Sequence, residues 1–376
     1  MTALLFVAIH GQKYVLHNAD ARSSVCCLKK KEVLIFMTDR FSLKTYAFFI
    51  LALLAVMLLC VCIGSVSIAP KDTLTAVFCT LLGKEVPAGI SKNIILNVRL
   101  PRVLNVALVG AALSLCGAAM QGLLRNPLAD GSTLGVSSGA SLGAVIALAL
   151  GVTVPGSEYG GTMLMAMAFA FLSLVLILSL AYALDHSLAT NSIILIGVIF
   201  SMFISSVINL ILSFLNDQVR SITFWTMGSL SGTGYAHTRI LSLALLICGG
   251  VIFRYARELN AFAIGEDNAR HIGVNVRRVK LVILITVSVM IGVCVSIGGS
   301  IGFVGLVVPH MARMIAGPNH RRLLPASMFS GAIFLLLADL IARTLLSPVE
   351  LSIGVVTSLV GAAAFVVIFY RARKAG

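Results

Sequence analysis

Two oppositely charged side chains, Asp339 and Arg343, stand four residues apart in a stretch that is otherwise apolar. Residues at this spacing share one face of an α-helix, so the carboxylate and the guanidinium can form an ion pair. A charge within an apolar segment long enough to cross a membrane marks a candidate functional residue. The pair can instead be structural, and Arg343 lies near enough to the expected outer boundary for its head group to reach toward water.

No other polar side chains have the spacing of a catalytic or metal site. The eight cysteines lie mostly in apolar runs, without the paired spacing of a zinc site, and we interpret them as small hydrophobic residues. His310 taken alone could be a metal ligand or a proton carrier, and a structural role is the competing interpretation. The only Gly-Lys pair, Gly83-Lys84, lacks the rest of a Walker A loop. We therefore expect no catalytic residue, no metal site and no cofactor bound by this chain.

The segments that carry these residues are predicted to be membrane-spanning helices. Of the 376 residues, 59% are hydrophobic and 11% are charged, whereas about a quarter of a soluble domain is charged. The apolar runs are continuous rather than alternating, which indicates helices and not a barrel. We predict an all-α polytopic membrane protein with about ten transmembrane helices of about 20 residues each. The predicted spans are residues 45–68, 102–121, 134–152, 162–185, 191–214, 238–254, 279–299, 301–316, 326–346 and 353–370.

Basic residues set the expected orientation and partners. The formal net charge is +14, but cationic residues next to membrane spans usually reflect the positive-inside bias, so we expect no nucleic-acid partner. The bias is satisfied when both termini and the polar segment 253–280 lie in the cytoplasm. Residues 1–36 lack the order of a signal peptide. They are either the product of an upstream start before Met37 or a disordered cytoplasmic tail, and the membrane domain is predicted over residues 37–376.

Residues 253–280 combine many charges with regularly placed apolar residues. The charges keep this segment out of hydrocarbon, whereas apolar residues such as Leu259 and Phe262 recur between them around Gly265 and Gly273. This pattern predicts two short amphipathic helices that are presented to a partner. Because the chain lacks an ATP site, any energy for transport would come from a partner that docks on this segment.

The segment between the second and third predicted spans has strong turn chemistry. Asn126-Pro127 is followed by Asp130-Gly131. This pattern predicts either a cytoplasmic hairpin that re-enters the membrane or an ordinary turn. Close approach of another helix to the third span is allowed by the small residues Gly135, Gly139 and Gly143.

A second break is predicted after the span over residues 279–299. Paired glycines allow a sharp bend there, and Gly305 and Pro309 follow. Proline cannot donate a backbone hydrogen bond, so neighbouring groups must satisfy a carbonyl that the helix leaves free.

Five fragments in a fixed order resemble the FecCD family, from about residue 45 to the C-terminus. They are NVRLPRVL at 97–104, GAAMQGLLRNPLADGSTLGVSSGA at 117–140, AIGEDNARHIGVNV at 263–276, GFVGLVVPHMARMIAGPNHRRLLP at 302–325 and ADLIARTLLSPVELSIGVV at 338–356. Each fragment alone is weak, but the ordered set is specific. The family comprises permease subunits of ABC importers for ferric siderophores, haem and cobalamin.

The resemblance implies a ten-helix permease in a bacterial cytoplasmic membrane, surrounded by lipid. It implies a second permease copy or homologue, two cytoplasmic ATPase subunits that hold ATP and Mg, and an extracytoplasmic binding protein that delivers an iron-chelate cargo. A ferric siderophore is the expected cargo, with haem or cobalamin as the alternative.

The resemblance also assigns roles to particular residues. It implies that the ATPase is coupled through Ala263, Gly265, Glu266, Asp267, Ala269, Arg270 and Gly273. It also implies that the binding protein docks on Arg99, Arg102 and Arg343, which would meet its acidic residues. Where the family usually has proline, this chain has Ser352 and Ala363, so the last external turn and the final helix are expected to be less kinked.

Two other classes of function compete with this prediction. A secondary transporter driven by an ion gradient would need no ATPase and would expose an essential intramembrane acid, for which Asp339 is the candidate. A purely structural membrane scaffold is disfavoured by the broken helices. No covalent chemistry is expected in this chain, so it is predicted to be a transport subunit rather than an enzyme.

Overall fold

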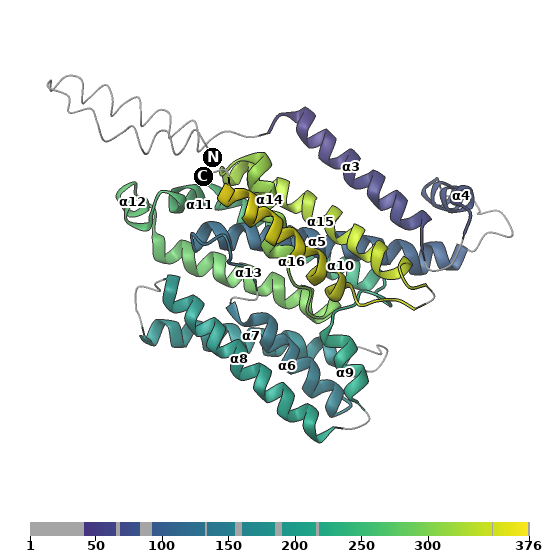
Figure 1. Ribbon diagram of the computed structural model, residues 1–376, viewed down its shortest axis with the longest axis horizontal. Helices are drawn as coiled ribbons and strands as arrows, with labels where there is room; N and C mark the ends of the chain where they lie inside the picture. Colours follow the sequence, from purple (N-terminus) through teal and green to yellow (C-terminus); the bar gives the residue numbers. More distant parts are fainter. Residues whose placement is uncertain are drawn as a thin grey trace. The chain divides into compact units, whose positions relative to one another are not determined.

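The computed structural model describes residues 41–64, 68–82, 92–131, 134–154, 160–184, 190–215, 218–347 and 349–374. The boundary predicted at residue 36 and the nature of residues 1–36 lie outside these residues. The regular elements of the described part are helices, labelled as in Figure 1. They are α3 (Leu43–Cys62), α4 (Pro70–Leu81), η1 (Ile94–Arg99), α5 (Leu100–Leu123), α6 (Val136–Ala149), α7 (Gly160–Leu184), α8 (Thr190–Phe214), α9 (Val219–Thr226), α10 (Tyr235–Arg254), α11 (Ala256–Ala263), α12 (Glu266–His271), α13 (Val276–Gly298), α14 (Val304–Ala316), α15 (His320–Thr344) and α16 (Ile353–Lys374).

Seven helices of the described part are long and apolar enough to cross a membrane. They are α3, η1 continued by α5, α7, α8, α10, α13 and α15. The other three predicted spans fall on the shorter apolar helices α6, α14 and α16. The all-helical class and the multi-pass character are thus confirmed, whereas the total of ten transmembrane helices stays a prediction.

The described part of the segment between the first two predicted spans contains helices. It includes α4, and the helix of the second span begins at η1, well before residue 102. Arg99, Pro101 and Arg102 interrupt the apolar pattern and moved the expected boundary too far along the chain. The structure accommodates Pro101 directly after the π-helical turn η1, since a proline ring disfavours regular α geometry before it.

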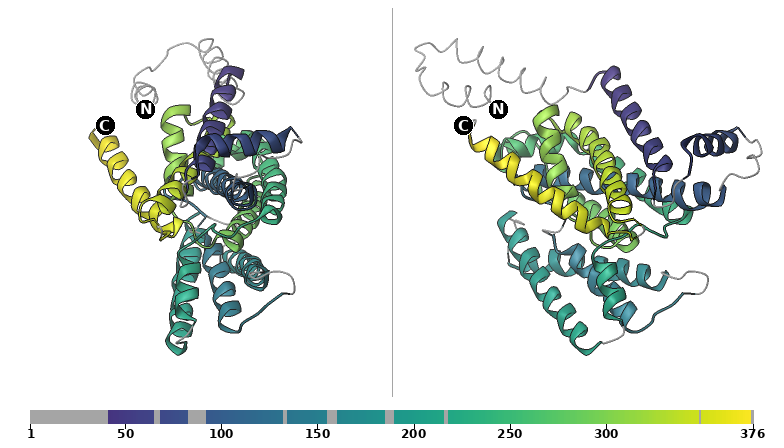
Figure 2. Two further views of the ribbon diagram at one scale, coloured as in Figure 1. Left: turned by 90° about the vertical axis from the view of Figure 1, so that its right-hand side faces the viewer. Right: turned by 45° about the vertical axis from the view of Figure 1, so that its right-hand side comes forward.

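Two groups of helices lie on either side of α13 (Figure 1). One group is formed by α6, α7 and α8, and the other contains α5, α10, α14 and α15. Figure 2 shows this grouping from two further sides. Helix α5 is buried along most of its length, which suits a helix that is apolar on all sides and surrounded by other helices.

Helices α5 and α15 pack with their backbones in close approach. A Cβ atom at Gly110 of α5 would overlap the backbone oxygen of Gly331 of α15. Similarly, a Cβ atom at Gly117 would overlap the carbonyl of Gly305 in α14. Van der Waals contact of this kind is a main source of helix association in membranes. It ties α5, α14 and α15 into one tightly packed group.

Candidate functional site

The polar segment 253–280 forms the two short helices that its pattern predicts. Helix α11 buries Leu259, Asn260 and Phe262, and it packs against α5 and α15. Helix α12 follows and leads into α13. Both short helices lie at one end of the long helices, at the left of Figure 1, while α4 lies at the opposite end.

Glycines set the turns around α12. Gly265 precedes this helix with φ of +120°, and Gly273 follows it with φ of +90°. Residues with a Cβ atom rarely adopt such angles, so glycine is required by the backbone at both places. Glu266 and Asp267 lie in the first turn of α12 and Arg270 in its last turn, an arrangement that complements the helix dipole.

Glu266 forms an ion pair within the chain. Its carboxylate lies 2.9 Å from Nζ of Lys280, which has no exposed surface. Thr190, the first residue of α8, donates a second hydrogen bond to Glu266 over 3.4 Å. The ion pair therefore joins α12 to α13, and the hydrogen bond from Thr190 joins α12 to the start of α8.

The outward face of this segment combines apolar and charged side chains, and we name it the coupling surface. Asp267 is 87% exposed and Arg270 54% exposed, and the two form an ion pair of 3.4 Å. Ala263 is also exposed, and so are Ile264 and Ile272 on either side of α12. The coupling surface consists of Ala263, Ile264, Asp267, Arg270 and Ile272.

The remaining predicted coupling residues lie beneath this surface or shape it. Ala269 is fully buried, so its methyl group packs inside the chain. Gly265 and Glu266 are half-buried, and Gly273 is exposed. The contribution of all of these residues to coupling stays a prediction.

A second polar site, which we name the charge cluster, lies where α3 ends and where η1 continues into α5. It contains Arg99, Arg102, Asp339, Arg343 and Glu350. Arg102 donates to Asp339 Oδ1 over 2.9 Å and to Glu350 Oε2 over 2.9 Å. Arg343 Nε lies 3.2 Å from Asp339 Oδ2, an ion-pair distance without hydrogen-bond alignment. The ion pair predicted from the spacing of Asp339 and Arg343 is therefore confirmed, and Arg102 is an additional partner.

The other arginines of the charge cluster bind the end of α3. Arg99 Nη1 donates to the carbonyls of Val61 and Cys62 over 3.1 Å each. Arg343 Nη2 donates to the carbonyl of Cys60 over 2.7 Å. The last carbonyls of a helix have no partner within it and carry partial negative charge, which a guanidinium satisfies. The sequence pattern gave no sign of this capping, because the partners are far apart along the chain.

Burial of the charge cluster changes one expectation and leaves another open. Arg343 is 2% exposed, so the expectation that its head group reaches water is wrong, since Asp339 and Cys60 hold it inside. Arg99 is 4% exposed and Arg102 11% exposed. The structure thus brings the three predicted docking arginines together, with Arg102 the most accessible, and their docking role stays a prediction.

The turn predicted at Asn126-Pro127 is present between α5 and α6. Leu128 N donates to Asn126 Oδ1 over 2.9 Å, which is the Asx-turn that asparagine favours. The place of Gly135 in the glycine row suggested that it belongs to the following helix. In the structure it does not. It precedes α6 with φ of +71°.

Two glycines within α6 allow close approach of another helix. A Cβ atom at Gly139 would overlap the Ser173 side chain, and one at Gly143 would overlap the Met165 carbonyl, both on α7. The close approach predicted for this row is present at Gly139 and Gly143. It is also present at Gly135, where a Cβ atom would lie 2.9 Å from Phe200 Cδ1 and 3.2 Å from the Gly197 carbonyl oxygen, both on α8.

A side chain from α5 binds the turn of α14 that Pro309 interrupts. Pro309 lies inside α14 and cannot donate to the carbonyl of Gly305, four residues earlier. Gln121 of α5, itself 1% exposed, donates to the next carbonyl, that of Leu306, over 3.0 Å. A side chain from α5 thus stabilises the interrupted turn, as polar groups do where helices break inside a membrane.

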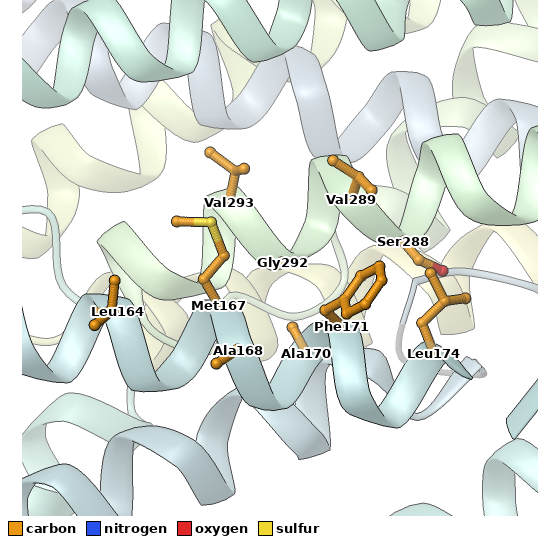
Figure 3. Close-up of a pocket in the computed structure, with 10 residues that line it drawn as sticks. All are labelled: Leu164, Met167, Ala168, Ala170, Phe171, Leu174, Ser288, Val289, Gly292 and Val293. Carbon is orange, nitrogen blue, oxygen red and sulfur yellow. The ribbon is translucent and has the colours of Figure 1, made fainter. Parts of the chain in front are cut away.

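An apolar cavity of about 380 Å³ lies between α7 and α13. Figure 3 shows Met167 and Phe171 of α7 facing Val289 and Val293 of α13 across it. Ser288 is the only polar residue in its lining. This lining offers few groups to a cargo that carries polar atoms, and both helices are candidate membrane spans.

Metal binding finds no support among the described residues. No group of three or more histidine, cysteine, aspartate or glutamate side chains there could hold a metal ion. The cysteines in the same part of the chain are free.

The structure is that of a multi-pass membrane protein of the transporter-permease type, with long apolar helices, shorter broken ones and two short amphipathic helices at one end. The model of the FecCD transport family matches residues 52–371. The chain belongs to the FecCD transport family.

Similar proteins are permease subunits of ABC transporters. The uncharacterized ABC transporter permease protein YvrB of Bacillus subtilis (strain 168) is 46% identical over 287 residues, 76% of this chain and 80% of YvrB. The hemin transport system permease protein HmuU of Yersinia pestis is 36% identical over 291 residues, 75% of this chain and 84% of HmuU. The cobalamin import system permease protein BtuC of Halobacterium salinarum is 36% identical over 296 residues, 79% of this chain and 78% of BtuC.

A solved structure shares the fold. It shows an ABC transporter described as of the metal-chelate type, in an inward-facing conformation. The TM-score is 0.76 at 30% identity, covering 87% of this chain and 99% of the solved one.

Proposed function

We propose that this chain is the permease subunit of an ATP-driven importer and that it carries a ferric siderophore across the cytoplasmic membrane. The coupling surface is the observation that carries this proposal. It presents two isoleucines and an exposed ion pair at one end of the helices, on a backbone fixed by Gly265, Gly273 and the pair of Glu266 with Lys280. A rigid, part-apolar surface of this kind suits a groove on an ATPase subunit.

Transport follows from relative movement of helices. ATP and Mg bind to two partner ATPase subunits, whose closure moves α11 and α12. This movement switches a path at the interface with a second permease subunit between outward and inward access. The chain supplies binding, packing and movement, and no covalent step.

The charge cluster supports this ATP-driven mechanism over a gradient-driven one. Both carboxylate oxygens of Asp339 lie within ion-pair distance of an arginine. Oδ1 lies near Arg102, and Oδ2 lies near Arg343. A proton or sodium relay would need a carboxylate that can exchange its partner, so this arrangement favours a structural role. At the same end, Arg102 is the group most accessible to acidic residues of an extracytoplasmic binding protein.

The identity of the cargo is the most specific part of the proposal. The similar permeases HmuU and BtuC are named for haemin and for cobalamin, so these are the alternatives. We expect uptake of an iron-55-loaded siderophore by proteoliposomes that contain the whole transporter and its binding protein. Uptake of haemin or cobalamin in its place would correct the cargo and retain the mechanism.

A charge exchange tests the coupling surface. The double variant Asp267→Arg with Arg270→Asp keeps the ion pair within α12 but reverses the sign of charge at each position. We expect co-purification of the cognate ATPase to fall about tenfold or more, because mismatched charges at an interface are costly. Lys44→Glu, an exposed charge change at the start of α3, is the matched control. Undiminished co-purification of the exchanged variant would refute the proposed docking.

A further inference from the structure

A buried amide joins the polar segment 253–280, which we name the coupling segment, to α15. Asn260 of α11 is 1% exposed, and its Nδ2 donates to Asn319 Oδ1 over 2.9 Å. The backbone N of His320 donates to Asn260 Oδ1 over 2.7 Å, and His320 Nδ1 lies 2.8 Å from the same oxygen. These contacts form one joint between α11 and the first residues of α15.

The joint occupies the N-terminus of α15, where backbone groups lack helical partners. Asn319 Oδ1 also accepts from Arg321 N over 3.0 Å, as an N-cap residue does. The amide of Asn260 therefore binds both the cap and the first N–H of the helix. In a dry environment such hydrogen bonds have no water to replace them. A movement of α11 must carry the start of α15 with it or leave these groups unpaired.

Helix α15 is in turn fixed to α5 along its length. At the joint, a Cβ atom at Gly122 of α5 would overlap the His320 ring. Midway, Gly110 meets Gly331, and at the far end Arg102 binds Asp339. These three contacts lie in one antiparallel register, so α5 and α15 form a single unit that runs from the joint to the charge cluster. We name it the α5–α15 pair.

We propose that Asn260 is a positioning residue that transmits movement of the coupling segment to the α5–α15 pair. The inference rests on the proposed function, since it requires that an ATPase moves α11. Coupling between distant sites is carried by packed side chains, hydrogen bonds, ion pairs and rigid helices that shift between two arrangements. Here such contacts are supplied by the joint, the glycine contacts and the charge cluster.

The test measures cargo taken up per ATP hydrolysed by the complete transporter in proteoliposomes. Asn260→Leu keeps a similar side-chain volume and removes every hydrogen bond of the joint. We expect the ATPase to co-purify and to hydrolyse ATP, while uptake per ATP falls about tenfold, the factor that corresponds to losing one to two buried hydrogen bonds. Asn319→Asp, which retains the cap and the acceptor for Asn260, should keep the wild-type ratio.

Asn105→Leu is the matched control. Asn105 of α5 is also fully buried, but its amide donates to the Gly234 carbonyl, away from the coupling segment. It should lower thermal stability and leave uptake per ATP unchanged. An unchanged ratio in Asn260→Leu, or a drop of the same size in Asn105→Leu, would overturn the proposal.

Two further outcomes separate this inference from the proposed function. Loss of ATPase co-purification in Asn260→Leu alone would assign the residue to docking and overturn transmission. Absence of ATP-driven uptake by the wild-type complex would instead refute the proposed function. Should Asn260→Leu fail to assemble, the pair Asn319→Ala and Asn319→Asp decides, because only the alanine variant removes the acceptor. Equal uptake per ATP in that pair would contradict transmission.

Discussion

At one end of the α5–α15 pair a neutral amide, Asn260, binds the first turn of α15, and at the other end the charge cluster joins α3, α5 and α15. Hydrogen bonds between neutral groups each contribute modestly to stability. Separating buried ions costs several times more, because Coulomb attraction is strong where water is excluded. The contrast indicates a movable joint at the coupling end and a fixed pivot at the charge cluster.

The largest expected effect is at the pivot. Asp339→Leu leaves the guanidiniums of Arg102 and Arg343 buried without their shared carboxylate. We expect it to lower the free energy of unfolding by about 3–5 kcal/mol, measured by thermal unfolding of the purified protein in detergent. If the free energy of unfolding fell by less than it does in any variant of the joint, the contrast between the two ends would be contradicted.

A smaller effect is expected at the ion pair beneath the coupling surface, and it should be asymmetric. Glu266→Gln leaves the fully buried Lys280 charge without its partner, whereas Lys280→Met leaves Glu266, whose side chain is 17% exposed, able to reach water. We expect Glu266→Gln to cost about 2–3 kcal/mol and Lys280→Met about 1 kcal/mol less. The same unfolding measurement compares the two variants. Equal losses would indicate that the pair is hydrated, which would make the coupling end looser than its geometry suggests.

The smallest of the three effects concerns the middle of the α5–α15 pair. Gly110→Ala places a methyl group against the Gly331 carbonyl and is expected to cost about 1–3 kcal/mol through overpacking. Gly250→Ala, in α10 with open space around its Cα, should be neutral or slightly stabilising. If the two variants behaved alike, the close contact that makes the pair rigid would be disproved.

Local patterns predicted local structure well. The two short helices of the coupling segment followed from charges interrupted by apolar residues and from two glycines. The pairing of Asp339 with Arg343 followed from helical spacing, and the turn at Asn126 followed from its side-chain chemistry. Each of these depends on residues within a few positions of one another, where covalent geometry restricts the possibilities.

Long-range partners could not be obtained in this way. Asn260 binds residues 59 and 60 positions away, and Arg343 binds a carbonyl 283 positions away. Which polar groups meet depends on how whole helices pack, and the spacing of residues in one segment holds no record of that. The same limit explains the misplaced start of the second span, because the bonds of Arg99 to the end of α3 help to stabilise this charge in an apolar setting.

Capping of α3 by two arginines also has a consequence for biosynthesis. The first candidate span of the described chain can bind Arg99 soon after it is made, but Arg343 arrives only with α15, the last of the seven candidate spans of the described residues. Until then the Cys60 carbonyl lacks this donor. Closure of the charge cluster therefore requires that the last of these candidate spans has been made.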